Sequence, residues 1–116
     1  MIRTEQEQTK AFIVTIRTQG EEIRRAQARL EELVSLVKTM GALSVSSLII
    51  PLREINSATL IGSGKVAELQ ALVEESQADC IVFDRDLPPR VQRNLEQQLD
   101  IAVIDRQEVI LQIFSD

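Results

Sequence analysis

The sequence lacks several residue types on which enzyme sites commonly depend. It contains no histidine, tryptophan or tyrosine, and its one cysteine is Cys80. The absence of histidine removes the usual general base at neutral pH. A lone cysteine without histidine builds neither an internal disulfide nor a zinc site of ordinary composition, and it is compatible with a reducing cytoplasm. We therefore predict that this chain has no catalytic residues and binds no metal or cofactor of its own.

Other scarce features argue against further classes of protein. The only aromatic residues are three phenylalanines, too few for a row of base-stacking platforms. No apolar run approaches the roughly 20 residues that span a membrane, and the start, MIRTEQEQTK, is too polar for a secretory signal. The net charge of −5 argues against a domain coated in nucleic acid, although it leaves room for a local basic patch. The prediction is a cytoplasmic protein without a membrane span.

What the sequence does contain is an alternation of two apolar patterns. Its 116 residues, 44% hydrophobic and 27% charged, suit one compact domain. Short apolar runs predict strands, and apolar residues at every third or fourth position predict helices. Strands are predicted at Ala11–Ile16, Leu43–Ile50, Cys80–Asp84 and Ile101–Asp105, with a candidate short strand at Ala58–Ile61, and helices over 21–40, from about 64 to 77, from 89 and from 106. This alternation predicts an α/β fold, a single open, mainly parallel β-sheet of four to five strands with helices on both faces.

Composition also orders the strands. Ala11–Ile16 and Cys80–Asp84 are the most apolar runs, so we expect them to be central neighbours covered on both faces. Cys80 should then pack in the core and be inert. Serines dilute Leu43–Ile50, which indicates a position near the sheet edge, and Pro51 should end that strand. The expected organisation is a polar tail over 1–9, the α/β domain over 10–105 and the start of a joining helix over 106–116.

The stretch LIGSGKVAEL, from Leu60 to Leu69, looks like a phosphate-binding loop but lacks two of its parts. Such a loop has a glycine five residues before its second glycine, and serine or threonine after the lysine. Thr59 and Val66 stand at these two positions. We interpret the stretch as a tight turn in which both glycines supply unusual backbone angles and Ser63 or Gly64 caps the next helix. An anion or nucleotide site at the helix N-terminus stays open as the alternative, with Gly62, Ser63, Gly64 and Lys65 as candidates.

Charged residues follow the apolar run CIVF. Asp84, Arg85 and Asp86 lie beyond the carboxyl end of a predicted strand, where open α/β sheets place ligands. Arg90 and Arg93 follow on the next helix. The stretch is either a polar binding edge or a solvated loop and helix face. Neither aspartate has a neighbour in sequence that would mark it as a catalytic carboxylate.

The first predicted helix carries three arginines, Arg24, Arg25 and Arg29, on what we expect to be its outer side. Glutamates stand close to each of them in sequence, and we place Glu21 and Glu22 in the first turn of the helix. Solvated ion pairs are the simplest interpretation of this pattern.

The final predicted helix is unusually apolar. It contains Val109, Ile110, Ile113 and Phe114, which so short a remaining chain cannot all cover. We therefore expect a longer parent protein, and self-association of this chain through residues 109–114.

Four stretches resemble, in order, the N-terminal domain of the HflX family of ribosome-associated GTPases: IGSGKVAEL, ADCIVFD, LPPRVQRNLE and VIDRQEVILQIF. The resemblance covers nearly the whole chain and is weakest before Ala42. Two positions depart from the family pattern, because Leu60 stands where the family usually has tyrosine and Pro88 where it usually has serine. Pro88 should leave the helix that begins at Pro89 without a side-chain cap, a loss of about 1 kcal/mol.

This resemblance implies a larger GTPase in which a helical segment and a GTP-binding domain follow in the same polypeptide. GTP and magnesium would be bound by that domain and not by this chain. It also implies that the protein binds the large ribosomal subunit, both RNA and protein, in ribosome splitting or rescue; candidate contacts are Arg85, Arg90, Arg93 and Lys65. We expect a non-catalytic domain that helps to dock the parent protein. Two alternatives are a small ATP-binding module that uses the GSGK turn and a purely structural domain.

Overall fold

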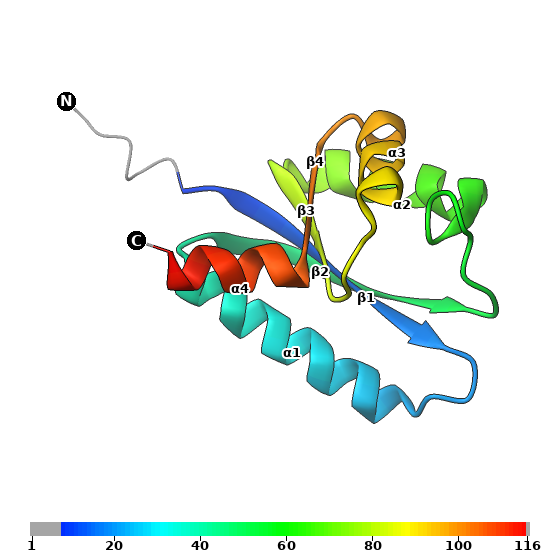
Figure 1. Ribbon diagram of the computed structural model, residues 1–116, viewed down its shortest axis with the longest axis horizontal. Helices are drawn as coiled ribbons and strands as arrows, with labels where there is room; N and C mark the ends of the chain where they lie inside the picture. Colours follow the sequence, from blue (N-terminus) through cyan, green and yellow to red (C-terminus); the bar gives the residue numbers. More distant parts are fainter. Residues whose placement is uncertain (1–7, 116) are drawn as a thin grey trace.

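Within residues 8–115, which the computed structural model describes, four parallel strands form one sheet in the order β2-β1-β3-β4 (Figure 1). The strands are β1 (Lys10–Thr18), β2 (Leu43–Leu52), β3 (Cys80–Phe83) and β4 (Ala102–Asp105). The helices are α1 (Ile23–Met40), α2 (Gly62–Ser76), α3 (Pro89–Leu99) and α4 (Arg106–Phe114). The predicted parallel α/β fold is thus confirmed. The candidate strand at Ala58–Ile61 is not formed, since Leu60 makes only an isolated antiparallel bridge with Asn56.

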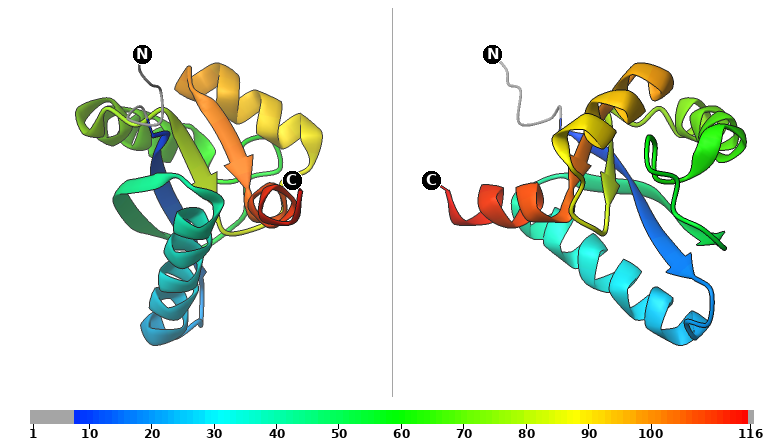
Figure 2. Two further views of the ribbon diagram at one scale, coloured as in Figure 1. Left: turned by 90° about the vertical axis from the view of Figure 1, so that its left-hand side faces the viewer. Right: turned by 45° about the vertical axis from the view of Figure 1, so that its right-hand side comes forward.

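A different pair of helices covers each face of the sheet (Figure 2). α1 and α4 lie together on one face, and α2 and α3 lie on the other. Side chains of β1 alternate between the two layers, because Phe12 and Val14 pack with α2 and α3, whereas Ala11 and Ile13 pack with α1 and α4. β1 and β3 pair directly and are buried on both faces, which confirms the predicted central neighbours. Cys80 is buried in the layer of α1 and α4, as expected.

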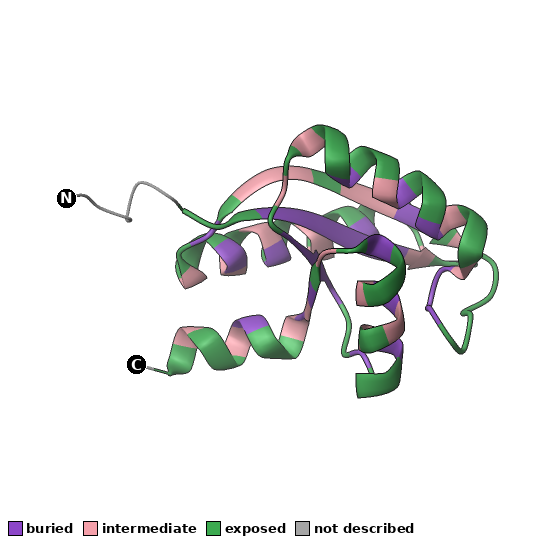
Figure 3. Ribbon diagram, turned by 90° about the horizontal axis from the view of Figure 1, so that it is seen from above, coloured by how far each residue is buried: buried purple, intermediate pink, exposed green. Residues whose placement is uncertain are grey.

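β2 lies at one edge of the sheet, as its serines predicted, and among the described strands it pairs only with β1. Most of its side chains are partly exposed, in contrast to the buried β1 beside it (Figure 3). The prediction that Pro51 ends this strand is wrong, because Pro51 lies opposite Arg17 and pairing continues to Leu52. An edge strand tolerates proline where the missing N–H would have faced away from the sheet.

Two helix starts differ from the sequence prediction. Glu21 and Glu22 precede α1, which begins at Ile23, so neither lies within its first turn. α2 begins at Gly62, slightly earlier than expected. The end of α1 is as predicted, because Gly41 has a left-handed φ of 106° that glycine adopts without strain.

α4 leaves part of its apolar surface uncovered. Val109 is fully buried against α1 and the sheet, but Leu111 is 60% exposed and Phe114 is 83% exposed. The expectation that this helix is incompletely covered is therefore met, whereas self-association through it stays a prediction. None of the helices within residues 8–115 is long and apolar enough to cross a membrane.

The predicted polar tail over 1–9 lies outside the described residues except for its last two positions. Gln8 donates a side-chain hydrogen bond to the Gly41 carbonyl at 3.0 Å, and the Thr9 carbonyl accepts one from the Leu43 N–H at 2.8 Å. These two residues therefore lie against the start of β2.

Candidate functional site: the carboxyl edge of the sheet

The GSGK sequence forms the first turn of α2 and not a loop before it. Leu60 and Gly62 have left-handed φ angles of 70° and 75°, which turn the chain into the helix, while Gly64 has no such angle. The residue before the helix is Ile61 and no side chain caps it, so the prediction that Ser63 or Gly64 is the cap is wrong. Because this segment is helical from its first glycine, its N–H groups do not wrap around an anion as a phosphate loop does.

Lys65 has a partner within α2. Its Nζ lies 3.7 Å from Glu68 Oε1, and its side chain lines a hollow next to Ile50 and Pro51 of β2. Exposed pairs of this kind contribute little free energy, so the ammonium group is still accessible to other partners.

Asp84 lies at the point where ligands usually bind to such a sheet. The chain leaves β1 toward β2 on one side and continues from β3 to β4 on the other, so the strand order reverses between β1 and β3. Open α/β sheets bind ligands outside the carboxyl ends of their strands at this switch point. Asp84 follows β3 directly, and its carboxylate accepts a hydrogen bond from the Ile16 N–H of β1 at 3.4 Å. Its side chain is only 1% exposed.

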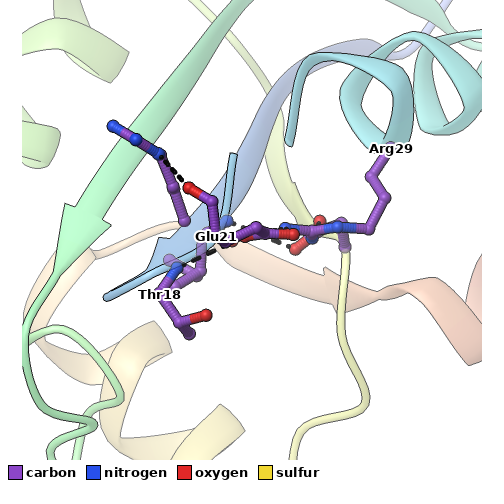
Figure 4. Close-up of polar contacts among 6 residues, drawn as sticks. Thr18, Glu21 and Arg29 are labelled. Carbon is purple, nitrogen blue, oxygen red and sulfur yellow. Dashed lines mark hydrogen bonds and ion pairs between the residues drawn. The ribbon is translucent and has the colours of Figure 1, made fainter. Parts of the chain in front are cut away.

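Arg29 extends from α1 toward Glu21 and Asp84 (Figure 4). Its Nη1 donates to Asp84 Oδ2, and its Nη2 donates to the Ile16 carbonyl at 2.9 Å and to both carboxylate oxygens of Glu21 at 2.7 Å. Glu21 is held in turn by the Thr18 N–H, which donates to Glu21 Oε1 at 3.3 Å. The expectation that Arg29 is a solvated residue on the outer side of its helix is therefore wrong, although its predicted pairing with a nearby glutamate is correct.

The electrostatics of this cluster differ between its two carboxylates. Burial raises the pKa of Asp84, and the Arg29 charge and the Ile16 N–H oppose that rise. The hydrogen bond from Arg29 lowers the pKa of Glu21. Burial would lower the pKa of Arg29, but its hydrogen bond to Glu21 and the charge of Asp84 outweigh that effect and raise it. The side chains of Arg29, Glu21 and Asp84 bind one another, so the cluster holds α1, β1 and the loop after β3 together.

The cationic candidates Arg85, Arg90 and Arg93 are all exposed. Arg85 lies in the loop that follows Asp84, and Arg90 and Arg93 lie on α3. Arg90 Nη2 donates to the Ser57 carbonyl at 3.3 Å, so this side chain also holds the loop before α2. Lys65 belongs to α2, which packs beside α3 on the same face of the sheet.

Asp105 is a buried structural position that the sequence interpretation missed. It is the last residue of β4 and lies opposite Phe83 of β3, and its Oδ2 accepts a hydrogen bond from the Leu87 N–H at 2.9 Å. Its Oδ1 accepts from the Glu108 N–H at 2.9 Å, and Glu108 accepts from the Asp105 N–H, which completes a capping box for α4. The spacing of an aspartate three residues before a glutamate is a sequence signal that could have predicted this cap.

The described residues offer little to a metal or a buried ligand. No group of three histidine, cysteine, aspartate or glutamate residues within 8–115 could hold a metal ion. A hollow of about 230 Å³ lies at the carboxyl ends of β1 and β2, and Arg17 and Arg53 line it. Arg17 Nε already donates to the Glu21 carbonyl at 2.9 Å.

Comparisons with known proteins agree with the fold and with the sequence motifs. A family model described as the N-terminal domain of a GTP-binding GTPase matches residues 27–115. The GTPase HflX of Treponema denticola is 48% identical over 86 residues, which cover 74% of this chain and 22% of that protein. The GTPase HflX of Akkermansia muciniphila is 39% identical over 106 residues, or 91% of this chain and 24% of that protein. The GTPase HflX of Lacrimispora saccharolytica is 38% identical over 115 residues, or 99% of this chain and 27% of that protein.

A solved structure supports the fold alone. The crystal structure of a GTP-binding protein from the archaeon Sulfolobus solfataricus in complex with GDP matches with a TM-score of 0.64 and 20% identity, covering 92% of this chain and 30% of that one. The class is thus an α/β domain of the kind found at the N-terminus of GTP-binding GTPases. Within that class, the chain belongs to the HflX family and corresponds to its N-terminal domain. It spans about a quarter of the length of these curated relatives.

Proposed function

We propose that this domain helps to dock a GTPase of the HflX family on the large ribosomal subunit in the cytoplasm, in ribosome splitting or rescue. In this proposal the full-length protein binds GTP and magnesium through a separate GTPase domain. The segment over 106–116 would join the docking domain to a helical segment that precedes the GTPase domain.

The observation that carries this proposal is the contrast between a switch point that the chain's own side chains occupy and exposed arginines that follow it in the sequence. Arg29 and Asp84 occupy the switch point, which is the usual ligand position of this fold. Arg85 and Arg93 remain exposed close to it in the chain. Arginine is suited to RNA because its planar group bonds phosphate oxygens in pairs. With a net charge of −5, the domain would have to bind through such a local surface.

Co-sedimentation of the chain with purified large ribosomal subunits over a range of salt concentrations tests the proposal. Arg85→Ala with Arg93→Ala should weaken binding and reduce the salt dependence by about two phosphate contacts. The matched control is Arg24→Ala with Arg25→Ala, which removes the same charge from the exposed side of α1. Equal losses in both double variants would show non-specific attraction and contradict the assigned surface. No binding of the unmodified chain at low salt would favour a purely structural domain.

The ATP-binding alternative has its own test. Calorimetric titration with ATP or GTP and magnesium should give no micromolar affinity, because a lysine beside a helix N-terminus contributes only about 0.3–1 kcal/mol. Micromolar binding requires roughly 8 kcal/mol. Tight binding that disappears in Lys65→Ala would establish the GSGK turn as a nucleotide site and overturn this part of the proposal.

A further inference from the structure

The outer edge of β2 is an unpaired sheet edge with the dimensions of a binding site. Within residues 8–115, β2 contains ten residues and pairs only with β1, whereas the strand at the opposite edge, β4, contains four. An exposed long strand presents a row of N–H and C=O groups that another strand can extend. Leu43 at its start is 47% exposed, so an apolar side chain is also available there.

Hollows flank this edge on both faces of the sheet. On the α1 side, a hollow of about 530 Å³ lies between Leu30 and Val34 of the helix and Ile49 of the strand. On the α2 side, a hollow of about 300 Å³ is lined by Leu72 of the helix and by Val45 and Leu48 of the strand. Leu72 is 40% exposed, although its helix packs on the sheet. Because side chains alternate along a strand, an added strand would place its residues in both hollows.

We propose that the occupant of this edge is the β2 strand of a second copy, paired antiparallel across a two-fold axis. The charges beside the edge favour this partner. Lys65 lines the edge next to Ile50 and Pro51, near the end of β2, and Glu75 lines it near the start of the strand, next to Val45. An antiparallel pair brings Lys65 of each copy toward Glu75 of the other. Because α1 and α2 lie on opposite faces of the sheet, a parallel pair would set α2 of one copy beside α1 of the other, so the contact between Lys65 and Glu75 is specific to the antiparallel pair.

The helix on the other face repeats this arrangement with the signs reversed. Glu31 lines the hollow on the α1 side. Lys38 lies two helical turns further along α1 and is exposed. The antiparallel arrangement of the two β2 strands therefore also brings Glu31 of each copy toward Lys38 of the other. Pro51 has no N–H group, so the shared ladder should end before it and involve residues 43–50.

This dimer does not depend on ribosome binding, and it differs from association through α4. Analytical ultracentrifugation of the 116-residue chain from about 1 µM to about 1 mM should show a monomer–dimer equilibrium, the range in which weak interfaces associate. Lys65→Glu and Glu75→Lys should each raise the dissociation constant about tenfold or more, since each sets like charges against one another. The double variant restores opposite charges and should recover the affinity. Circular dichroism of each variant checks that the fold is intact.

Hydrogen exchange and a control on α4 complete the test. Amides within residues 43–50 should become more protected as the concentration of the chain rises, because the shared ladder engages them. Phe114→Ser changes the most exposed apolar residue of α4 and should leave the dimer unchanged. A chain that stays monomeric to about 1 mM would overturn the proposal. A dimer that Phe114→Ser dissociates, or that ignores both charge reversals, would overturn it equally.

Discussion

Replacement of Arg29 by methionine should destabilise the fold substantially and in a pH-dependent way. The guanidinium bridges Glu21, the Ile16 carbonyl and Asp84, and the Asp84 side chain is 1% exposed. Loss of one partner leaves the buried carboxylate without its cation, which costs about 3–5 kcal/mol for a fully buried pair. Arg29 itself is 37% exposed, so water can reach part of the vacated space and the expected loss falls to about 2–3 kcal/mol.

Urea denaturation at pH 7 measures this loss. With a denaturant slope of about 1.5 kcal/mol/M, a loss of about 3 kcal/mol moves the midpoint by about 2 M. The matched control is Arg25→Met, an exposed arginine of the same helix, which should change stability by less than about 0.5 kcal/mol.

The pH dependence of Arg29→Met has a definite sign. Burial already raises the pKa of Asp84, and removal of the cation should raise it further. Because the folded-state pKa then lies above that of the unfolded chain, protonation of Asp84 stabilises the folded variant as the pH falls through the raised pKa. The difference in the free energy of unfolding between Arg29→Met and the unmodified chain should therefore become smaller at acid pH.

A double-mutant cycle separates the ion pair from packing. Arg29→Met combined with Asp84→Asn removes both charges and should be more stable than Arg29→Met alone. Additive losses across the cycle, or a loss from Arg29→Met that does not change with pH, would refute the view that an unpaired carboxylate is the cause.

The layered fold could be predicted from sequence because it depends on local patterns. Runs such as Ala11–Ile16, apolar at all positions but Thr15, are typical of strands that are covered on both faces, and this places them in the centre of a parallel sheet. The serines of β2 likewise predict its lower burial from local composition alone. Boundaries were less predictable, as at Pro51, because tolerance of proline depends on which side of the strand is unpaired.

The ion-pair cluster could not be predicted in the same way, because its members are brought together by tertiary packing. Arg29 and Asp84 are 55 residues apart, and their contact depends on how α1 lies over the ends of β1 and β3. One sequence signal was available, since Arg29 lies three residues after Ala26 and four before Leu33, both of which are buried. That spacing puts Arg29 beside the core-facing stripe of α1 and not opposite it. The charge pattern alone, with glutamates at many positions, did not distinguish this arginine from Arg24 or Arg25.

Three further predictions concern titration, reactivity and capping. Glu21→Gln should lower the free energy of unfolding by about 1–2 kcal/mol at neutral pH. Because Arg29 lowers the folded-state pKa of Glu21, this loss of stability should vanish as the pH falls through that lowered pKa. Urea melts at several pH values measure it. Burial raises the pKa of Cys80 to about 11, so Ellman's reagent should label it at pH 8 only through unfolding, and fast labelling of the native chain would contradict the buried position. The last prediction compares Pro88→Ser with Pro88→Ala. Pro88 precedes α3 and provides no side-chain cap, whereas serine can accept a hydrogen bond from an N–H of the first turn. Both variants lose the rigidity of proline in the unfolded chain, so that effect cancels between them. Pro88→Ser should therefore be more stable than Pro88→Ala by about 1 kcal/mol in thermal or urea melts, and equal stabilities would show that the start of α3 gains nothing from a cap.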